Sequence, residues 1–209
     1  MKNRYIDLIE QTFDFPQAEF DRDDSGDLRF HGIPLMEVIE KFGTPLKFFY
    51  LPVIGEQIAE ARSWFKAAMD KYEYEADYHY CYVTKSNHFN HVIKETIKQG
   101  SHLETSSAYD VMIMTKLYEE GVLPADRYIV CNGFKTDPYL DAIVDLRKKG
   151  YENIVPVIDN LSEYDRLDQK LQEPINIGLR IASEEEPKFE FYTSRLGIGY
   201  KNIVPFYLE

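Results

Sequence analysis

The fold of this chain is decided by the stretch Tyr82-Val83-Thr84-Lys85-Ser86-Asn87-His88-Phe89. Residues 76–84 before it are rich in aromatic and β-branched side chains, which predicts a buried strand. After it, apolar residues recur at helical spacing from Phe89 to Ile97. Lys85 therefore lies in a strand-to-helix turn, the position where catalytic residues gather in parallel α/β proteins. A lysine there can form a Schiff base, although a solvated lysine closing a strand is the ordinary alternative.

The same order of strand and helix extends along most of the chain. The expected strands are 46–51, 76–84, 101–105, 128–131, 154–158 and 175–182, and the expected helices are 54–72, 89–97, 109–120, 137–149 and 162–171. Strands that are apolar throughout and alternate with helices predict a parallel sheet buried on both faces. The fold class is therefore α/β, an incomplete (β/α)₈ barrel with about six of the eight strands present.

The N-terminal part has a different pattern. Residues 5–10 suggest a short helix, 21–27 a polar loop, 28–33 a short strand and 36–42 a helix that Gly43-Thr44-Pro45 ends. We expect residues 1–45 to form an N-terminal extension and residues 46–209 to form the partial barrel.

The composition of the chain argues against several classes of protein. The chain has 209 residues, 44% of them hydrophobic, and a net charge of −12. An acidic chain lacks the basic surface that nucleic-acid binding needs, and no apolar run predicts a membrane span or an export signal. Cys81 and Cys131 are expected to be reduced, as in a cytoplasmic protein. The five histidines form no set with metal-ligand spacing, so no metal site is expected.

Two further charged residues end expected strands. Glu104 either lines a pocket or caps the following helix through Ser106 or Ser107. Arg180 either lies at a functional site or pairs with a carboxylate at the barrel mouth, since a charge that closes an apolar strand needs a partner. The loop 132–135 after the fourth strand borders the same region or is ordinary turn chemistry.

Four motifs occur in an order that resembles one family. They are Val83-Thr84-Lys85-Ser86-Asn87, Leu103-Glu104-Thr105-Ser106-Ser107, Gly178-Leu179-Arg180-Ile181 and Ser194-Arg195-Leu196-Gly197. Together they resemble the pyridoxal-phosphate-dependent decarboxylases of basic amino acids, which have the alanine-racemase-like fold. The residues in these motifs are most similar to those of the biosynthetic arginine decarboxylases. Thr84 before the lysine, Glu104 in place of aspartate and Asp110 in place of glutamate depart from the family pattern.

The resemblance implies a function and a set of site residues. Lys85 would hold pyridoxal 5′-phosphate covalently, and Glu104 and Arg180 would contact it. The substrate would be a basic amino acid, most simply arginine, which would become agmatine in polyamine biosynthesis. Ornithine or diaminopimelate decarboxylation, a racemase, a pyridoxal-phosphate carrier protein and a homologue without catalysis are the alternatives.

The resemblance also implies what is missing. The family's cofactor-stacking histidine, its glycine-rich phosphate loop and its C-terminal β-domain have no counterpart in these 209 residues. We therefore expect the chain to be the N-terminal half of a longer enzyme that is a homodimer, and to be inactive alone.

Overall fold

The structure, a computed structural model, describes residues 19–182 and 197–208. The chain forms two compact units that meet in sequence between Tyr50 and Leu51. The helix expected at residues 5–10 and the motif residues 194–196 lie outside the described residues.

The described part of the first unit is an antiparallel meander followed by a helix. Its strands are β1 (Phe20–Arg22), β2 (Leu28–Phe30) and β3 (Ile33–Pro34), and α2 (Leu35–Phe42) follows. The expected loop 21–27 is wrong in part, because its first two residues pair with β2 and only the remainder turns. The Asp23 carboxylate makes that turn by accepting hydrogen bonds from the backbone of Ser25 and Asp27.

The strand predicted at residues 46–51 is wrong. Residues 46–50 have no regular secondary structure and pair with no strand. Two of their aromatic rings instead contact Phe30 of β2, with centroids 5.6 Å away for both Phe48 and Tyr50. Burial of aromatic area against the hairpin therefore satisfies this segment, which an apolar pattern alone cannot distinguish from sheet pairing.

The second unit is a parallel α/β layer. Its strands lie in the order β4-β5-β6-β7-β8, and every pairing is parallel. Among the described residues the sheet therefore has five strands rather than the six predicted. The elements are α3 (Pro52–Lys71), β4 (Cys81–Val83), α4 (Asn90–Lys98), β5 (His102–Thr105), α5 (Ala108–Glu119), β6 (Ile129–Cys131), α6 (Asp137–Lys148), β7 (Ile154–Ile158), α7 (Leu161–Lys170), β8 (Gly178–Leu179) and α8 (Tyr200–Leu208).

The predicted alternation is confirmed, although four strands are shorter than expected, two of them by most of their length. Only 81–83 of the segment 76–84 is a strand, and only 178–179 of 175–182. An isolated parallel bridge between Ile181 and Ile198 continues the line of β8. Both β4 and β8 are outer strands of the five-strand order, so among the described strands each pairs with a neighbour on one side only.

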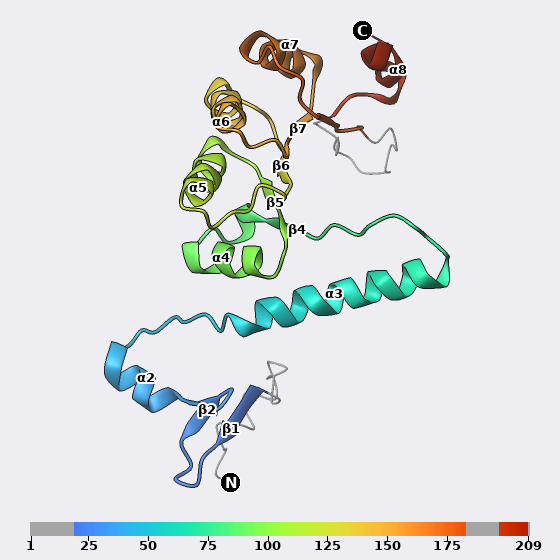
Figure 1. The fold of residues 1–209 in the computed structure, drawn as a ribbon. Helices are drawn as coiled ribbons and strands as arrows, with labels where there is room; N and C mark the ends of the chain where they lie inside the picture. The colour runs from blue at the N-terminus through green and yellow to red at the C-terminus, as the bar shows by residue number, and fades with distance from the viewer. Residues whose placement is uncertain (1–18, 183–196, 209) are drawn as a thin grey trace, which may run out of the picture. The chain divides into compact units, whose positions relative to one another are not determined.

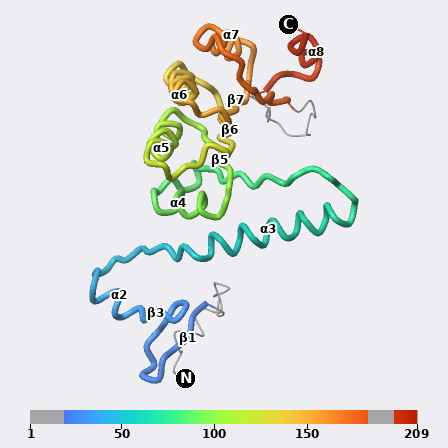
Figure 2. Tube along the Cα trace, in the orientation of Figure 1, coloured from blue at the N-terminus to red at the C-terminus, as the bar shows by residue number. Residues whose placement is uncertain are grey.

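The sheet is covered by helices on one face. Helices α4 to α7 stack in a row along that face, as the ribbon and the tube both show (Figures 1 and 2). Along β6 and β7 the buried side chains of Ile129, Cys131, Ile154 and Ile158 alternate with others that are only half-buried. The prediction of strands buried on both faces is therefore wrong for this chain.

The core lies between the covered face and the helices. Its larger cluster joins β5, β6 and β7 to helices α4, α5 and α6 and includes Ile93, Leu103, Met114, Leu117, Ile129, Tyr139, Ile143, Leu146 and Ile154. Helix α3 is tied to the end of α4 by Arg62, which donates to the carbonyls of Gln99 (2.8 Å) and Gly100 (3.0 Å). The half-buried face carries the valines that a closed barrel would enclose.

Candidate functional site

Polar side chains gather where the five parallel strands end. Because all five strands run the same way, their carboxyl ends lie at one edge of the sheet. Lys85, Glu104, Asn132, Asp159 and Arg180 lie at the ends of β4, β5, β6, β7 and β8 respectively. This edge is where ligands bind in parallel α/β proteins.

Lys85 is presented by a rigid turn. Residues Thr84–Ser86 form a short 3-10 helix directly after β4. Thr84 is buried, and its hydroxyl donates to the carbonyl of Glu104 at 3.0 Å. The Ser86 hydroxyl donates to the carbonyl of Val83 at 2.7 Å. The Lys85 side chain is exposed and forms no hydrogen bond or ion pair with the described residues, so its amine is free to react.

Glu104 faces the side of the sheet that the helices leave open. The strand register places it in a row with Val83, Val130 and Val155, all half-buried. One of its carboxylate oxygens accepts from the side-chain amide of Asn132 at 3.2 Å. The two polar side chains thus share the open face, above a floor of valines.

Glu104 does not cap the helix that follows, so that alternative is wrong. The Ser107 hydroxyl accepts from the backbone N–H of Asp110, and the Asp110 carboxylate accepts from the backbone N–H of Ser106 and from the Ser107 hydroxyl. This is a reciprocal cap of the kind that satisfies the first N–H groups of a helix. Asp110 is therefore a structural residue, and the Glu104 carboxylate remains available on the open face.

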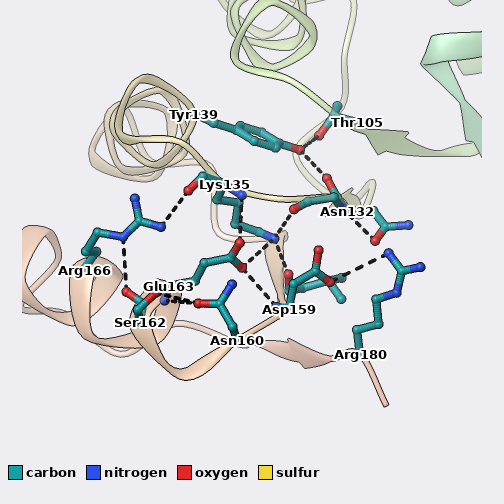
Figure 3. A network of polar contacts seen from close by, with 12 residues as sticks. Thr105, Asn132, Lys135, Tyr139, Asp159, Asn160, Ser162, Glu163, Arg166 and Arg180 are labelled. Atoms are coloured by element: carbon teal, nitrogen blue, oxygen red, sulfur yellow. Dashed lines mark hydrogen bonds and ion pairs between the residues drawn. The ribbon is translucent and has the colours of Figure 1, made fainter. Parts of the chain in front are cut away.

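The end of β6 is held by a buried aromatic residue. The hydroxyl of Tyr139 in α6 lies 3.0 Å from the Thr105 hydroxyl and donates to the carbonyl of Asn132 at 3.2 Å (Figure 3). Burial raises the pKa of Tyr139 above its ordinary value, so the hydroxyl remains a donor at neutral pH. These bonds tie the backbone that carries Asn132 to β5.

Lys135 is buried and therefore does not line the edge. Its ammonium donates to the carbonyls of Gly133 and Val157 and lies 3.5 Å from a carboxylate oxygen of Glu163, which is also fully buried. The Glu163 carboxylate also accepts from the backbone N–H groups of Lys135 (2.9 Å) and Asp159 (3.0 Å). One ion pair thus joins the loop that follows β6 to the first turn of α7 (Figure 3).

Asp159 is the second buried acid of this network. Its side chain is fully buried, and in the described part of the chain its carboxylate accepts no hydrogen bond. The closest cation is Arg180, whose guanidinium lies 3.9 Å away and is partly exposed. Burial raises the pKa of the Asp159 carboxyl group above its ordinary range. The expected carboxylate partner of Arg180 is therefore Asp159.

The structure groups the expected site residues in two places. The Lys85 turn contacts the backbone of Glu104, whereas Arg180 pairs with Asp159 at the other end of the edge. Strands β4 and β8 are four positions apart, about 19 Å along a flat sheet at about 4.8 Å per strand. Curvature of the sheet, as in a barrel, shortens this distance across the open face.

Asp159 and Glu163 were not predicted, although the sequence carries a signal for each. Asp159 directly follows the apolar strand 154–158, as Glu104 and Arg180 end theirs. Asn160 and Glu163 have the spacing of a capping box, and the Asn160 side chain does accept from the backbone of Glu163. That Glu163 turns inward to Lys135 depends on packing and has no sequence signature.

A reactive thiol and a metal centre are the other kinds of site that the residue types of this chain could form. Cys81 and Cys131 are both free thiols, and burial raises the pKa of Cys131 to about 12, so that thiol is not a nucleophile at neutral pH. Within residues 19–182 and 197–208, no three His, Cys, Asp or Glu side chains converge as a metal site requires. No described helix is both long enough and apolar enough to cross a membrane.

Comparison with known proteins identifies relatives among the decarboxylases. The chain is 25% identical over 150 residues to a biosynthetic arginine decarboxylase of Prochlorococcus marinus, and the match covers 68% of this chain and 22% of that protein. It resembles the crystal structure of the biosynthetic arginine decarboxylase of Campylobacter jejuni, with a TM-score of 0.62 and 19% identity over 78% of this chain and 29% of that one.

A second solved structure is the diaminopimelate decarboxylase of M. jannaschii, with a TM-score of 0.69 and 21% identity over 92% of this chain and 45% of that one. These likenesses show the fold, a partial (β/α) barrel. The chain spans about a fifth of the length of the first curated relative.

A family model described as the pyridoxal binding domain of pyridoxal-dependent decarboxylases matches residues 56–205, which include every strand of the parallel sheet and the turn that presents Lys85. The chain belongs to this pyridoxal-dependent decarboxylase family.

Proposed function

We propose that this chain binds pyridoxal phosphate covalently through the Lys85 amine, as part of an enzyme that decarboxylates a basic amino acid. The observation that carries the proposal is the unpaired, exposed amine of Lys85 on a braced turn at the carboxyl edge of the sheet. A free amine is what an aldehyde cofactor requires. The family of the domain supports the same cofactor.

The residues around Lys85 fit a flat, polar aromatic ring. Val83, Val130 and Val155 offer an apolar floor on the open face, and the Glu104 carboxylate stands in the same row. Asn132 donates to that carboxylate and so fixes its direction. When bound, the cofactor would supply an electron sink for the bond to the departing carboxyl group.

The roles of this chain's own residues follow from their positions. Lys85 would hold the cofactor and bind it again after turnover. Glu104 would accept a hydrogen bond or a proton at the edge of the cofactor ring. Arg180 would place a positive charge at the far side of the open face. Buried Tyr139 and Thr105 would keep the backbone of the edge in place.

Arginine is the proposed substrate because the curated relatives are named as arginine decarboxylases. The likeness to a diaminopimelate decarboxylase keeps a second basic amino acid as the alternative. The net charge of −12 favours attraction of a cationic substrate. We propose a cytoplasmic homodimer for the whole enzyme, in keeping with the reduced cysteines and the family.

The first test is reductive trapping. The chain is incubated with pyridoxal phosphate, reduced with borohydride and digested, and the modified lysine is identified by mass spectrometry. We expect the label on Lys85 and its loss in Lys85→Ala. Lys135 is the internal control, because its buried amine is engaged by two carbonyls and Glu163. Labelling that is spread over the surface lysines and unchanged in Lys85→Ala would reject the proposal.

The second test separates substrates. The loaded chain is titrated with arginine, ornithine, lysine and diaminopimelate while the visible absorbance of the cofactor is recorded. We expect arginine to change the spectrum at the lowest concentration. A lower half-saturating concentration for diaminopimelate would transfer the assignment to the alternative substrate.

A further inference from the structure

The buried position of the Asp159 carboxylate lowers the free energy of unfolding of the chain. Its side chain is fully buried, and neither of its oxygens accepts a hydrogen bond from the described residues. A buried carboxylate without hydrogen bonds is strongly unfavourable unless a cation compensates it. A residue kept at such a cost often serves function rather than folding.

The buried lysine nearby compensates the Asp159 charge only in part. Lys135 already donates to two backbone carbonyls and lies 3.5 Å from Glu163. Lys135 and Glu163 balance each other, so the two buried acids and one buried base leave one negative charge. Only Arg180, 3.9 Å from Asp159, forms a second ion pair with this group among the described residues.

Arg180 is held at its backbone from two sides. Its N–H donates to the carbonyl of Ile158 at 3.1 Å, and its carbonyl accepts from the N–H of Ile198 at 2.7 Å. Its guanidinium, by contrast, is partly exposed and has Asp159 as its sole ion-pair partner in the part of the chain that the structure describes. The direction of the side chain therefore depends on Asp159.

We infer that Asp159 is a positioning residue, which uses a buried and otherwise unpaired carboxylate to hold the Arg180 guanidinium over the carboxyl edge of the sheet, toward the cofactor. Attraction between charges is stronger in a low-dielectric interior than in water. Lys135 also attracts the Asp159 carboxylate. Its ammonium is already bonded to two carbonyls and paired with Glu163, so Arg180 is the cation whose side chain this attraction can orient. The part of the inference that concerns the cofactor rests on the proposed function.

The first experiment needs no cofactor. The order parameter of the Arg180 Nε–H group is measured by NMR in the wild-type chain and in Asp159→Asn. We expect a restricted group in the wild type and a value below about 0.6, typical of flexible groups, in the variant. Equal order parameters in the two proteins would overturn the inference. The control is Asp141→Asn, which removes an exposed carboxylate paired with Lys170 at 2.7 Å.

A second variant covers the case in which Asp159→Asn does not fold. Arg180→Met removes the cation from a partly exposed position and leaves the buried carboxylate in place. The Asp159 carboxyl group, followed by ¹³C NMR, should then titrate at a higher pH than in the wild type, because one of the two cations that favour its charged form is gone. An unchanged titration would show that the two groups are not coupled and would overturn the inference.

The third experiment measures the affinity of the chain for pyridoxal phosphate by absorbance. Asp159→Asn and Arg180→Met should each raise the dissociation constant by about tenfold, and the double variant should raise it no further, because Asp159 acts through Arg180. Wild-type affinity in Asp159→Asn would overturn the positioning role while leaving Lys85 trapping intact. If trapping fails in the wild type, the proposed function is rejected instead. The order parameter of Arg180 would then still test whether Asp159 positions that side chain.

Discussion

Lys135 and Glu163 form an ion pair in which neither side chain is exposed to solvent, with the ammonium nitrogen 3.5 Å from a carboxylate oxygen. The carboxylate also bonds the backbone N–H groups of Lys135 and Asp159, and the ammonium bonds two carbonyls. The pair thus fixes the ends of β6 and β7 relative to each other. Asp159, whose backbone N–H this carboxylate holds, and its ion-pair partner Arg180 therefore depend on the Lys135–Glu163 pair for their positions.

Loss of the buried lysine should be severe. Lys135→Met leaves Glu163 buried without its cation, and breaking a buried pair in this way costs about 3–5 kcal/mol. Urea unfolding measures the loss. The matched control is Lys170→Met, whose exposed partner is Asp141, and it should cost far less, because solvent screens an exposed ion pair. Equal costs for the two variants would show that the buried pair adds nothing beyond a surface pair.

The buried acid at the end of β7 should make stability depend on pH. The pKa of Asp159 is raised in the folded chain, so the folded state binds the proton of this carboxyl group more tightly than the unfolded state does. Stability should fall as pH rises from the unfolded value of about 3.9 through the raised folded value, and then level off. Asp159→Asn should remove this loss and be the more stable protein at pH 7. A variant that is less stable than the wild type at pH 7 and unchanged in pH profile would contradict the prediction.

The threonine that precedes Lys85 should stabilise the turn. Thr84 is buried and donates to the carbonyl of Glu104, so Thr84→Val keeps the shape and removes one hydrogen bond. We expect a loss of about 1 kcal/mol in the free energy of unfolding. Thr84→Ser, which keeps the hydroxyl, should retain more of the trapping rate at Lys85 than Thr84→Val. Identical trapping rates in the two variants would show that the bond does not hold the turn.

A histidine pair at the opposite edge should respond to acid. His102 accepts from the backbone N–H of Tyr128 at 2.9 Å and lies 2.9 Å from His79. Its neutral form therefore carries its proton on Nε2 and donates it to His79. Burial, His79 and nearby Arg127 lower the pKa of His102, partly offset by Asp126.

The sign of the effect follows from that lowered pKa. The unfolded chain binds a proton more readily, so the contribution of His102 is complete above about pH 6.5 and is lost as pH falls from there through the folded pKa. Chemical denaturation between pH 5 and 8, repeated with His102→Gln, measures it. A slope that His102→Gln leaves unchanged would assign the pH dependence to other groups.

A glycine beside Arg180 should not tolerate a side chain. Gly197 has φ +112°, and a Cβ atom there would lie 2.8 Å from the nitrogen of Ala182 and 3.0 Å from the carbonyl oxygen of Arg180. Backbone atoms cannot rotate away, so Gly197→Ala should cost more than about 1 kcal/mol. Gly121→Ala is the comparison. The φ of Gly121 is also positive, but a Cβ atom added there would meet no atom of another segment within 4 Å. Thermal unfolding that ranks the two variants equally would show that the clash is relieved.

Local patterns predicted most of the second unit. The strand 154–158 was predicted with its observed bounds, and helices α3 to α7 were predicted to within about two residues, because apolar periodicity, capping residues and glycine stops are all local in sequence. Helix α8 was not predicted. The turn with Lys85 was predicted for the same reason. Strand pairing was predicted less well, since residues 46–50 have the apolar pattern of a strand but contact Phe30 instead.

The amino-acid sequence by itself determined the order of strands and helices, the turn that presents Lys85, and the family. These depend on side chains that are neighbours along the chain. The tertiary structure alone decided that Lys135 is buried, that Glu163 turns inward to it, and that Arg180 pairs with Asp159 rather than with another acid. Each of these depends on which residues from separate strands meet at low dielectric, and no spacing within one segment encodes that meeting.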